Sequence, residues 1–553
     1  MNPIWHDLRH ALRLLRKTPG FTTVAILTLG LGLGACTAIY TVVYSVLLRP
    51  LPYPQPDRIM QLWQITPSRT DGRFSDPNYD DVRSQNRTFE SMAAFYDNVA
   101  SVTGGASATR VTYSGISRDL LTVLRIQPLL GRAFTPDEQV PGGNPAVLVG
   151  HSFWREQLGG NPNLSGLTLK FGNRTYAVIG VMPPEFRFPG DAQLWVPREL
   201  EPPLPSRTAH NWRVVGRLRD GVTLDQARGD LRPIAQRLKQ QHGDDTTMVD
   251  VAVVPLHDQI VSRVRQVLLL LLGAVGFLLL VACANVVNLL LTRATTRQRE
   301  LAVRAALGAG RLRLLMPFLS ESFVLTTAGG MLGVLMALAG VHGLLQLEPG
   351  GLPRVDEIRV SWPVLGFAFA VSTVTALLLG VLAATRVMKA DVYERLKEGQ
   401  RTMAGGSSSA RLRDALVVAQ LAVSLVLLIG AGLLGRSFLQ LVQQQTGFRT
   451  EHLITMELAS PDNLGQAGPQ QEALLRRRIR FHDEIQARMR ALPGVTEVGG
   501  IDAFPLTGFG ADGRFLILEG TPPPKDFDEF RDMIRNKVPI SELKPHFRKR
   551  YSS

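Results

Sequence analysis

The residues of this sequence that could carry out catalysis are few and far apart. His151 and His210 are isolated, and the sequence contains neither an H-E-x-x-H metal motif nor a G-x-S-x-G nucleophile motif. The acidic pair Asp80-Asp81 is typical of a solvated turn. No G-x-x-x-x-G-K-[ST] phosphate-binding loop occurs in the 553 residues, so they do not bind ATP in that way. We therefore expect no enzyme activity, no cofactor and no metal site.

One basic segment has residue types that suit it to binding a partner protein. Arg293–Arg313 reads RATTRQRELAVRAALGAGRLR. Its residues 298–307 are mostly Ala, Leu, Arg and Glu, which are good helix formers, and Gly308 and Gly310 then mark a stop. The segment predicts a short helix that lies at the inner membrane surface.

The candidate site consists of residues along this helix. They are Arg299, Glu300, Leu301, Arg304, Ala306 and Gly308. Spacings of four and three place Leu301, Ala305 and Gly308 on one face of a helix, which leaves the charged side chains available to a soluble partner. An ordinary positively charged connector between membrane segments accounts for the same residues, and this alternative stays open.

Long uncharged runs flank the basic segment and must position it. Arg265 to Arg293 encloses 27 residues without a charge, and Glu321 to Glu348 encloses 26. Each run is long enough to cross a hydrocarbon core of about 30 Å as a helix. The net charge of +14 comes largely from Arg and Lys beside such runs, which fits membrane topology better than nucleic-acid binding. We expect five spans with the N-terminus in the cytoplasm.

The basic segment and its flanks resemble a known family. RQRELAVRAALGAGRLRLLMPFLSESFVLTTAGGMLG is similar to the signature of FtsX/MacB-type ABC transporter permeases, whose pattern R-E-[IL]-[AG]-[VI]-R-x-A-[LV]-G-A falls on Arg299 to Ala309. The opening, from LRHALRLLRKTPGF through LLRPLPYPQPDRI, resembles the acidobacterial duplicated orphan permease subgroup. PAVLVGHSFWREQLGGNPNLSGLTLKFGNRTYAVIGVMPPEF resembles part of the MacB-like extracytoplasmic domain.

The resemblance implies a function in export. It implies that the helix at Arg299–Ala309 touches a separate ABC ATPase subunit of the MacB/LolD type, and that the permeases form a homo- or hetero-dimer in the bacterial inner (plasma) membrane. The resemblance further implies the mode of action that is frequent among MacB-type relatives, in which movement is transmitted to the outer domain instead of substrate passing through the core of the bundle. The few ionisable residues of the predicted spans fit that mode, and Glu321 is expected to pair with Arg313 or to reach the interface.

The fold class that we predict is an α-helical multi-pass membrane protein with an α+β extracytoplasmic domain between spans 1 and 2. Its parts are a cytoplasmic amphipathic helix (1–20), span 1 (21–48), a MacB-like periplasmic core domain (49–262), an FtsX-like permease domain with spans 2–4 (266–385), a cytoplasmic linker (386–414), span 5 (415–435) and the incomplete start of a second extracytoplasmic domain (436–553). The start of a second copy agrees with the duplicated architecture that the resemblance implies.

Several local patterns make narrower predictions. Gly30 and Gly34 form a small-residue face suited to close helix packing. Gly172-Asn173 predicts a hairpin turn between two strands. Thr223 is a candidate N-cap with Gln226 three residues later. Pro233 lies inside the helix that follows, so a kink or two shorter helices are both possible.

Three other functions compete with the permease. The chain could be a membrane-tethered binding or sensory protein, or a truncated permease that no longer functions. An intramembrane enzyme would need a pair of acidic or His residues at membrane depth, and the predicted spans contain no such pair. The basic segment favours the permease, because a tether has no need of it. The cargo and the partner ATPase are not encoded in any pattern that we recognise.

Overall fold

The computed structural model describes residues 3–105, 108–172, 174–296, 311–346, 353–389, 407–443, 453–456 and 470–500. The chain divides into two compact units, Met1–Asn463 and Leu464–Ser553. In the second unit the described residues form one long helix, α13 (Gln470–Arg490). All the contacts below lie within the first unit.

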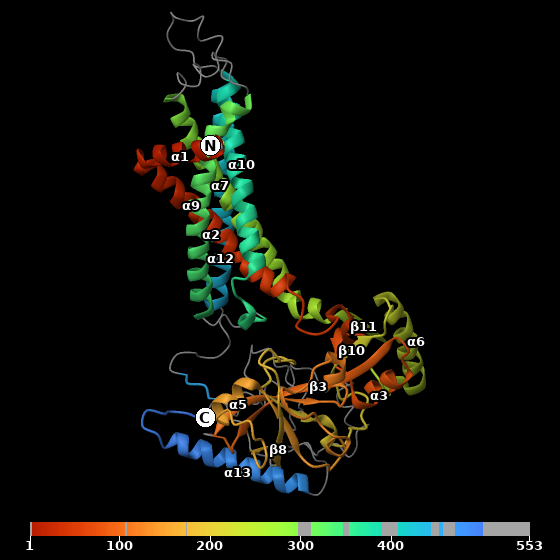
Figure 1. Ribbon diagram of the computed structural model, residues 1–553. Helices are drawn as coiled ribbons and strands as arrows, with labels where there is room; N and C mark the ends of the chain where they lie inside the picture. The colour runs from red at the N-terminus through yellow and green to blue at the C-terminus, as the bar shows by residue number, and fades with distance from the viewer. Residues whose placement is uncertain are drawn as a thin grey trace, which may run out of the picture. The chain divides into compact units, whose positions relative to one another are not determined.

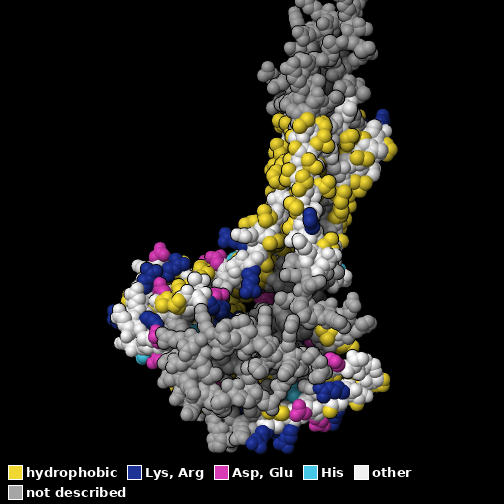
Figure 2. Space-filling view, turned by 180° about the vertical axis from the view of Figure 1, so that it is seen from behind, with side chains coloured by type: hydrophobic (Ala, Val, Ile, Leu, Met, Phe, Trp, Pro, Cys, Tyr) yellow, Lys and Arg dark blue, Asp and Glu magenta, His cyan; other side chains and the backbone are white. Residues whose placement is uncertain are grey.

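The first unit contains a bundle of long apolar helices (Figure 1). They are α2 (Pro19–Val43) with the π-helical turn η1 (Tyr44–Leu48), α7 (Leu256–Thr296), α9 (Arg311–Gln346), α10 (Trp362–Lys389) and α12 (Ser407–Gln443). Among the described residues, five helices are long and apolar enough to span a membrane. Hydrophobic side chains gather over the outside of this bundle (Figure 2). An apolar surface of this size is stable in lipid and unfavourable in water. The prediction of five spans is confirmed.

The glycine face predicted on the first span packs directly against a second glycine face. Gly30 and Gly34 of α2 meet Gly329 and Gly333 of α9. A Cβ atom on Gly34 would lie 3.0 Å from the carbonyl oxygen of Gly333, and one on Gly333 would lie 2.8 Å from the backbone nitrogen of Gly34. The two backbones therefore touch, which only glycine permits. The expected close packing is confirmed, and it joins span 1 to span 3.

Two other helices complete the inner contacts of the bundle. α1 (Pro3–Arg16) is amphipathic and buries Leu15 in a cluster with Leu29 of α2 and Phe318 of α9. Gln420 of α12 donates a hydrogen bond of 2.8 Å to Asn285 of α7, so the last helix has a polar contact with the bundle.

Between α2 and α7 the chain forms an α+β domain built on one mixed sheet. Its eleven strands are β1 (Ile59–Thr66), β2 (Arg69–Gly72), β3 (Phe89–Val102), β4 (Thr109–Ile116), β5 (Leu130–Gly131), β6 (Ala146–Val149), β7 (Thr168–Phe171), β8 (Arg174–Val181), β9 (Leu194–Pro197), β10 (Arg213–Leu218) and β11 (Asp250–Pro255). The order is β11-β1-β10-β3-β4-β9-β6-β8-β5, with β2 on β1 and β7 on β8. The predicted α+β domain is confirmed.

Helices cover different parts of this sheet and divide its core. α3 (Asp76–Gln85) and α6 (Leu224–His242) lie beside β10 and β11 (Figure 1) and enclose one apolar cluster. α4 (Leu120–Leu124) packs into a second cluster, and α5 (His151–Gln157) into a third. The second cluster matters most here, because it reaches the membrane helices.

The local predictions for this domain are confirmed. β7 and β8 form an antiparallel hairpin with Phe171 opposite Arg174, and Gly172 in the turn has a φ of 54°. Thr223 and Gln226 make a reciprocal capping box at the start of α6. Pro233 lies inside α6 without ending it, so the single-helix form is the one adopted.

Candidate functional site

The predicted partner-binding residues fall outside the described part of the chain. Arg299, Glu300, Leu301, Arg304, Ala306 and Gly308 all belong to residues 297–310, of whose structure nothing is stated. Their role stays a prediction. The structure does give the two helices that flank them, since α7 ends at Thr296 and α9 begins at Arg311.

α7 connects the outer domain to this segment without an intervening loop. β11 ends at Pro255 and α7 begins at the next residue, Leu256. The helix runs for 41 residues, which corresponds to about 60 Å. One end of α7 is therefore joined directly to the sheet of the outer domain.

The first turn of α7 is part of the core of the outer domain. Leu256 is 2 % exposed and belongs to the same apolar cluster as Leu51 and Ile59. The indole Nε1 of Trp63 on β1 donates a 3.1 Å hydrogen bond to Oε1 of Gln259. The helix is therefore anchored in the domain by apolar packing and by a hydrogen bond to the sheet.

A single arginine holds the outer end of the first span. The guanidinium of Arg354 donates hydrogen bonds to the carbonyl oxygens of Arg49 (2.6 Å) and Pro50 (3.1 Å), where the chain leaves η1. It also binds both carboxylate oxygens of Glu357, at 2.9 and 2.7 Å. A cation at the carbonyl end of a helix is stabilising, and the bidentate carboxylate fixes its orientation. Arg354 thus fastens the outer loop between spans 3 and 4 to the exit of span 1.

An apolar cluster lies beneath this arginine and joins the same elements. Val46 of η1, Val261 and Leu268 of α7, Val341 of α9 and Ile358 are all buried in it. We call this cluster, together with Arg354 and Glu357, the joint. Three spans and one outer loop meet there, next to the point where the outer domain begins.

The linker from the joint to β1 is fixed at its far end as well. Gln55 has a left-handed φ of 49°, and its side-chain oxygen accepts hydrogen bonds from Arg58 (2.8 Å) and Arg125 (3.1 Å). Arg217, which is fully buried, donates to the Gln55 carbonyl at 3.3 Å and to the Val123 carbonyl at 2.7 Å. Burial lowers the pKa of Arg217. Residues 49–58 are therefore held at both ends.

Tyr53, in the middle of this linker, is half-buried and packs against the second core cluster. Burial, and after it the charge of Glu357, raises the pKa of the Tyr53 phenol.

Two histidines of the outer domain, His210 and His151, make local contacts. His210 contacts the Arg73 carbonyl through Nδ1 at 3.0 Å and the Thr247 hydroxyl through Nε2 at 3.2 Å. His151 lies beside the Trp154 ring. Within the described residues, no three His, Cys, Asp or Glu side chains lie close enough to hold a metal ion.

The sequence analysis missed the joint. Arg354 stands in a short loop that the pattern EPGGLPRVDEIR marks only as polar. One signal could have drawn attention to it, since arginine is unusual in a short loop on the outer side of a membrane protein.

Two family models match the two parts of the first unit. The MacB-like periplasmic core domain matches residues 22–234, and the FtsX-like permease C-terminal domain matches residues 272–392. The chain belongs to the MacB/FtsX-type permeases. This permease is accordingly a multi-pass protein of the bacterial inner membrane.

Individual relatives share about a quarter of their aligned residues with this chain. The permease is 26% identical over 343 residues to the macrolide export ATP-binding/permease protein MacB of Chlorobium luteolum, covering 59% of this chain and 48% of that protein. It is 25% identical over 284 residues to the pyoverdine export ATP-binding/permease protein PvdT of Pseudomonas entomophila, covering 49% and 40%. It spans about half the length of these curated relatives or less. The periplasmic region of MacB from Actinobacillus actinomycetemcomitans aligns with 38% of the chain at 18% identity and a TM-score of 0.29.

Proposed function

We propose that this chain is the permease subunit of an ABC-type export system. In this proposal an ATPase on the inner side acts on the segment around Arg299–Ala309, and α7 passes the displacement to the outer domain. The observation that carries the proposal is the continuity of α7, which is anchored in the outer-domain core at Leu256 and is described as far as Thr296, three residues before Arg299. The chain itself performs no catalysis.

The family supports an ATPase partner. The relatives are named as combined ATP-binding/permease proteins. These 553 residues contain no phosphate-binding loop of the G-x-x-x-x-G-K-[ST] type, and in this proposal a separate subunit binds the nucleotide. A second permease copy, to form a dimer, and a cytoplasmic N-terminus belong to the same proposal.

In this proposal two helices, α7 and α9, transmit movement to the joint. α9 is 36 residues long, about 54 Å, and begins where the partner-binding segment ends. Near its outer end Val341 enters the joint with Val46 and Val261. A movement of the inner segment would therefore reach the joint through both helices, and the fixed linker 49–58 would carry it into β1.

Co-purification tests the docking part of this proposal. The affinity-tagged chain, expressed in its own host, should retain an ABC ATPase, identified by mass spectrometry and by ATP hydrolysis. Arg304→Glu should reduce recovery about tenfold or more, because about 1–3 kcal/mol is lost with each charged hydrogen bond. Arg401→Glu, which makes the same charge change in the other predicted inner loop, serves as the control. Equal recovery from all three proteins would contradict the docking role.

A further inference from the structure

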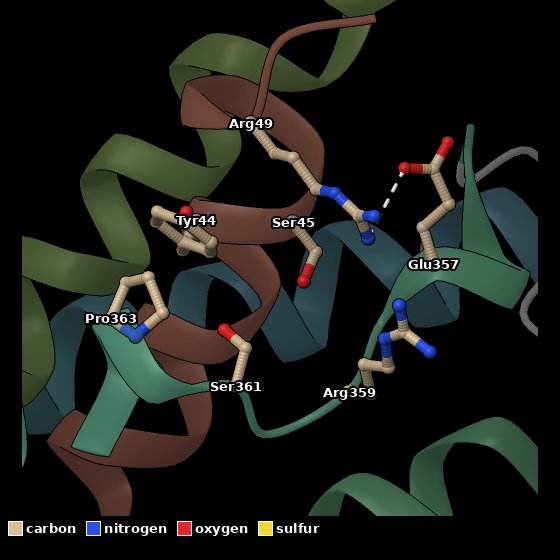
Figure 3. Close-up of a pocket in the computed structure, with 7 residues that line it drawn as sticks. All are labelled: Tyr44, Ser45, Arg49, Glu357, Arg359, Ser361 and Pro363. Atoms are coloured by element: carbon tan, nitrogen blue, oxygen red, sulfur yellow. Dashed lines mark ion pairs between the residues drawn. The ribbon is translucent and has the colours of Figure 1, made fainter. Parts of the chain in front are cut away.

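A small pocket opens beside the joint, between the exit of span 1 and the start of span 4 (Figure 3). It is lined by Tyr44, Ser45, Arg49, Glu357, Arg359, Ser361 and Pro363. None of the functions discussed above uses it.

The pocket holds more positive charge than its own acid can neutralise. Glu357 is the one carboxylate among the lining residues, and it is already bound by both prongs of Arg354. Arg49 reaches the same carboxylate at a longer distance, 3.5 Å. Arg359 is exposed, and in the described part of the chain the structure gives it no ion pair. In Figure 3 the guanidinium groups of Arg49 and Arg359 both lie on the Glu357 side of the pocket. A further anion would complete the site.

Two hydroxyl groups add hydrogen-bonding capacity on the opposite side. The side chain of Ser45 lines the pocket, although this residue is only 2 % exposed. The Oγ atom of Ser361 is buried and has no hydrogen-bond partner among the described residues. Figure 3 shows the two hydroxyl oxygens directed toward the space between them. A buried hydroxyl without a partner is costly, so a ligand oxygen is the natural partner here.

The start of a long helix contributes to the same place. Ser361 immediately precedes α10, whose first residues are Trp362 and Pro363. The unsatisfied N–H groups at a helix start favour an anion, and this helix is 28 residues long. Guanidinium groups, hydroxyls and a helix N-terminus together match a phosphate group.

The surroundings of the pocket belong to the membrane interface. Trp362 is 85 % exposed, as expected of an aromatic side chain at headgroup level. Tyr40 of α2 stacks on Phe367 of α10 at 3.7 Å between ring centroids, one helical turn from the pocket residues Tyr44 and Pro363. Phe369, further along α10, is 71 % exposed. A ligand with its phosphate in the pocket would therefore have an apolar surface beside it for acyl chains.

We propose that this pocket binds the phosphate of an anionic phospholipid headgroup, of the phosphatidylglycerol class. The lipid would bridge η1 and the start of α10 next to Arg354 and so stiffen the joint. Assignment to the outer leaflet rests on the proposed topology, whereas the binding itself does not depend on the proposed function.

Native mass spectrometry of the full chain in detergent tests the proposal. Wild-type protein should retain added phosphatidylglycerol in preference to phosphatidylcholine. Arg359→Gln should weaken phosphatidylglycerol binding about fivefold, since an arginine near an anionic lipid contributes about that factor. Arg265→Gln is the matched control, because Arg265 is an exposed arginine near the outer end of α7 and does not line the pocket. Phosphatidylglycerol binding by the Arg265→Gln variant should stay within about twofold of wild type.

Two further arms separate the possible outcomes. Ser361→Ala removes only a hydroxyl and should weaken binding about threefold without affecting the fold. Millimolar inorganic phosphate should not displace the lipid. Equal losses in Arg359→Gln and Arg265→Gln would show diffuse charge attraction and overturn the proposal. So would displacement by inorganic phosphate, or equal retention of the two lipids, because either result would show that the pocket does not select an anionic lipid.

Discussion

Arginine side chains bind backbone carbonyl groups at both ends of the linker between span 1 and the outer domain. Arg354 does so at Arg49 and Pro50, and Arg217 does so at Gln55 and Val123. Guanidinium suits this role because its planar fork carries five donors and stays charged when buried. Each of these arginines joins segments that are far apart in the sequence, so each stabilises the tertiary arrangement more than any one element.

The half-buried carboxyl of Glu199 shows a different situation, in which one of the two carboxylate oxygens lacks a hydrogen-bond partner among the described residues. Its Oε1 accepts a 3.0 Å hydrogen bond from the backbone N–H of Arg118, while its Oε2 is buried without a hydrogen-bond partner. Burial raises the pKa of Glu199 above its usual value. The folded state therefore holds the proton more tightly than the unfolded state. Stability is lost as the pH rises from the ordinary pKa of Glu through the raised pKa of the folded state.

We expect Glu199→Gln to stabilise the outer domain at neutral pH, because the amide keeps the acceptor and removes the buried charge. The gain should shrink as the pH falls below about 4.3, the ordinary pKa of Glu, because the wild-type carboxyl then becomes protonated in the unfolded state as well as in the folded state. Urea unfolding of residues 49–262, expressed alone, would measure it at several pH values. The exposed Glu185→Gln is the control and should show little change. A gain that is independent of pH would contradict the charge explanation.

At the scale of elements, the membrane part is organised around backbone contact between α2 and α9. Gly380 of α10 also lies close to α9, since a Cβ atom there would lie 2.6 Å from Cδ2 and 3.0 Å from Cα of Leu319. Packing of this kind leaves no room for side chains at the crossing points, and loss of even one glycine forces the helices apart. Close packing at glycine positions therefore joins α2, α9 and α10 within the bundle.

Gly333→Val should destabilise the bundle by about 1–3 kcal/mol, because the new side chain would meet backbone atoms of α2 that cannot move independently. Gly340→Val is the matched control on the same helix, where nothing lies within 4 Å of an added Cβ. Thermal unfolding of both variants in one detergent would compare them. Similar melting temperatures for the two variants would show that the glycine crossing does not limit stability.

At the scale of the whole molecule, the outer domain is an insertion between two members of one helix bundle. Its core reaches the membrane helices through Leu256 and Ile260 of α7. α7 is a single candidate span that begins at the outer domain, so we expect Thr296 at its other end to lie across the membrane from that domain.

Cysteine labelling measures that arrangement and its direction. In a chain with Cys36 and Cys283 replaced by alanine, a membrane-impermeant maleimide should label Glu156→Cys on intact spheroplasts. It should label Glu300→Cys only after lysis. Label on Glu300→Cys in intact cells would reverse the proposed orientation.

Local patterns in the sequence predicted individual helices and strands well. They could not predict contacts between segments that are far apart in the sequence. The capping box at Thr223 and the hairpin at Gly172 depend on neighbouring residues, so their chemistry is visible in the text. Gly30 and Gly34 indicated a packing face, yet nothing in their neighbourhood names Gly333 as the partner. The sheet order and the role of Arg354 likewise depend on which distant segments meet. The basic segment around Arg304 was predicted from its residues and its family pattern, and its structure lies outside the described residues.

The facing glycine pairs also limit the order in which the parts of the protein can assemble during synthesis. Gly30 and Gly329 are separated by roughly 300 residues. At about 5–20 residues per second, the ribosome releases the first glycine face about 15–60 s before the second one exists. The first helix must wait in the bilayer for that time while the inserted domain is exported and folds. Only then can the third helix arrive and close the crossing, so the membrane part is completed after the part that lies outside it.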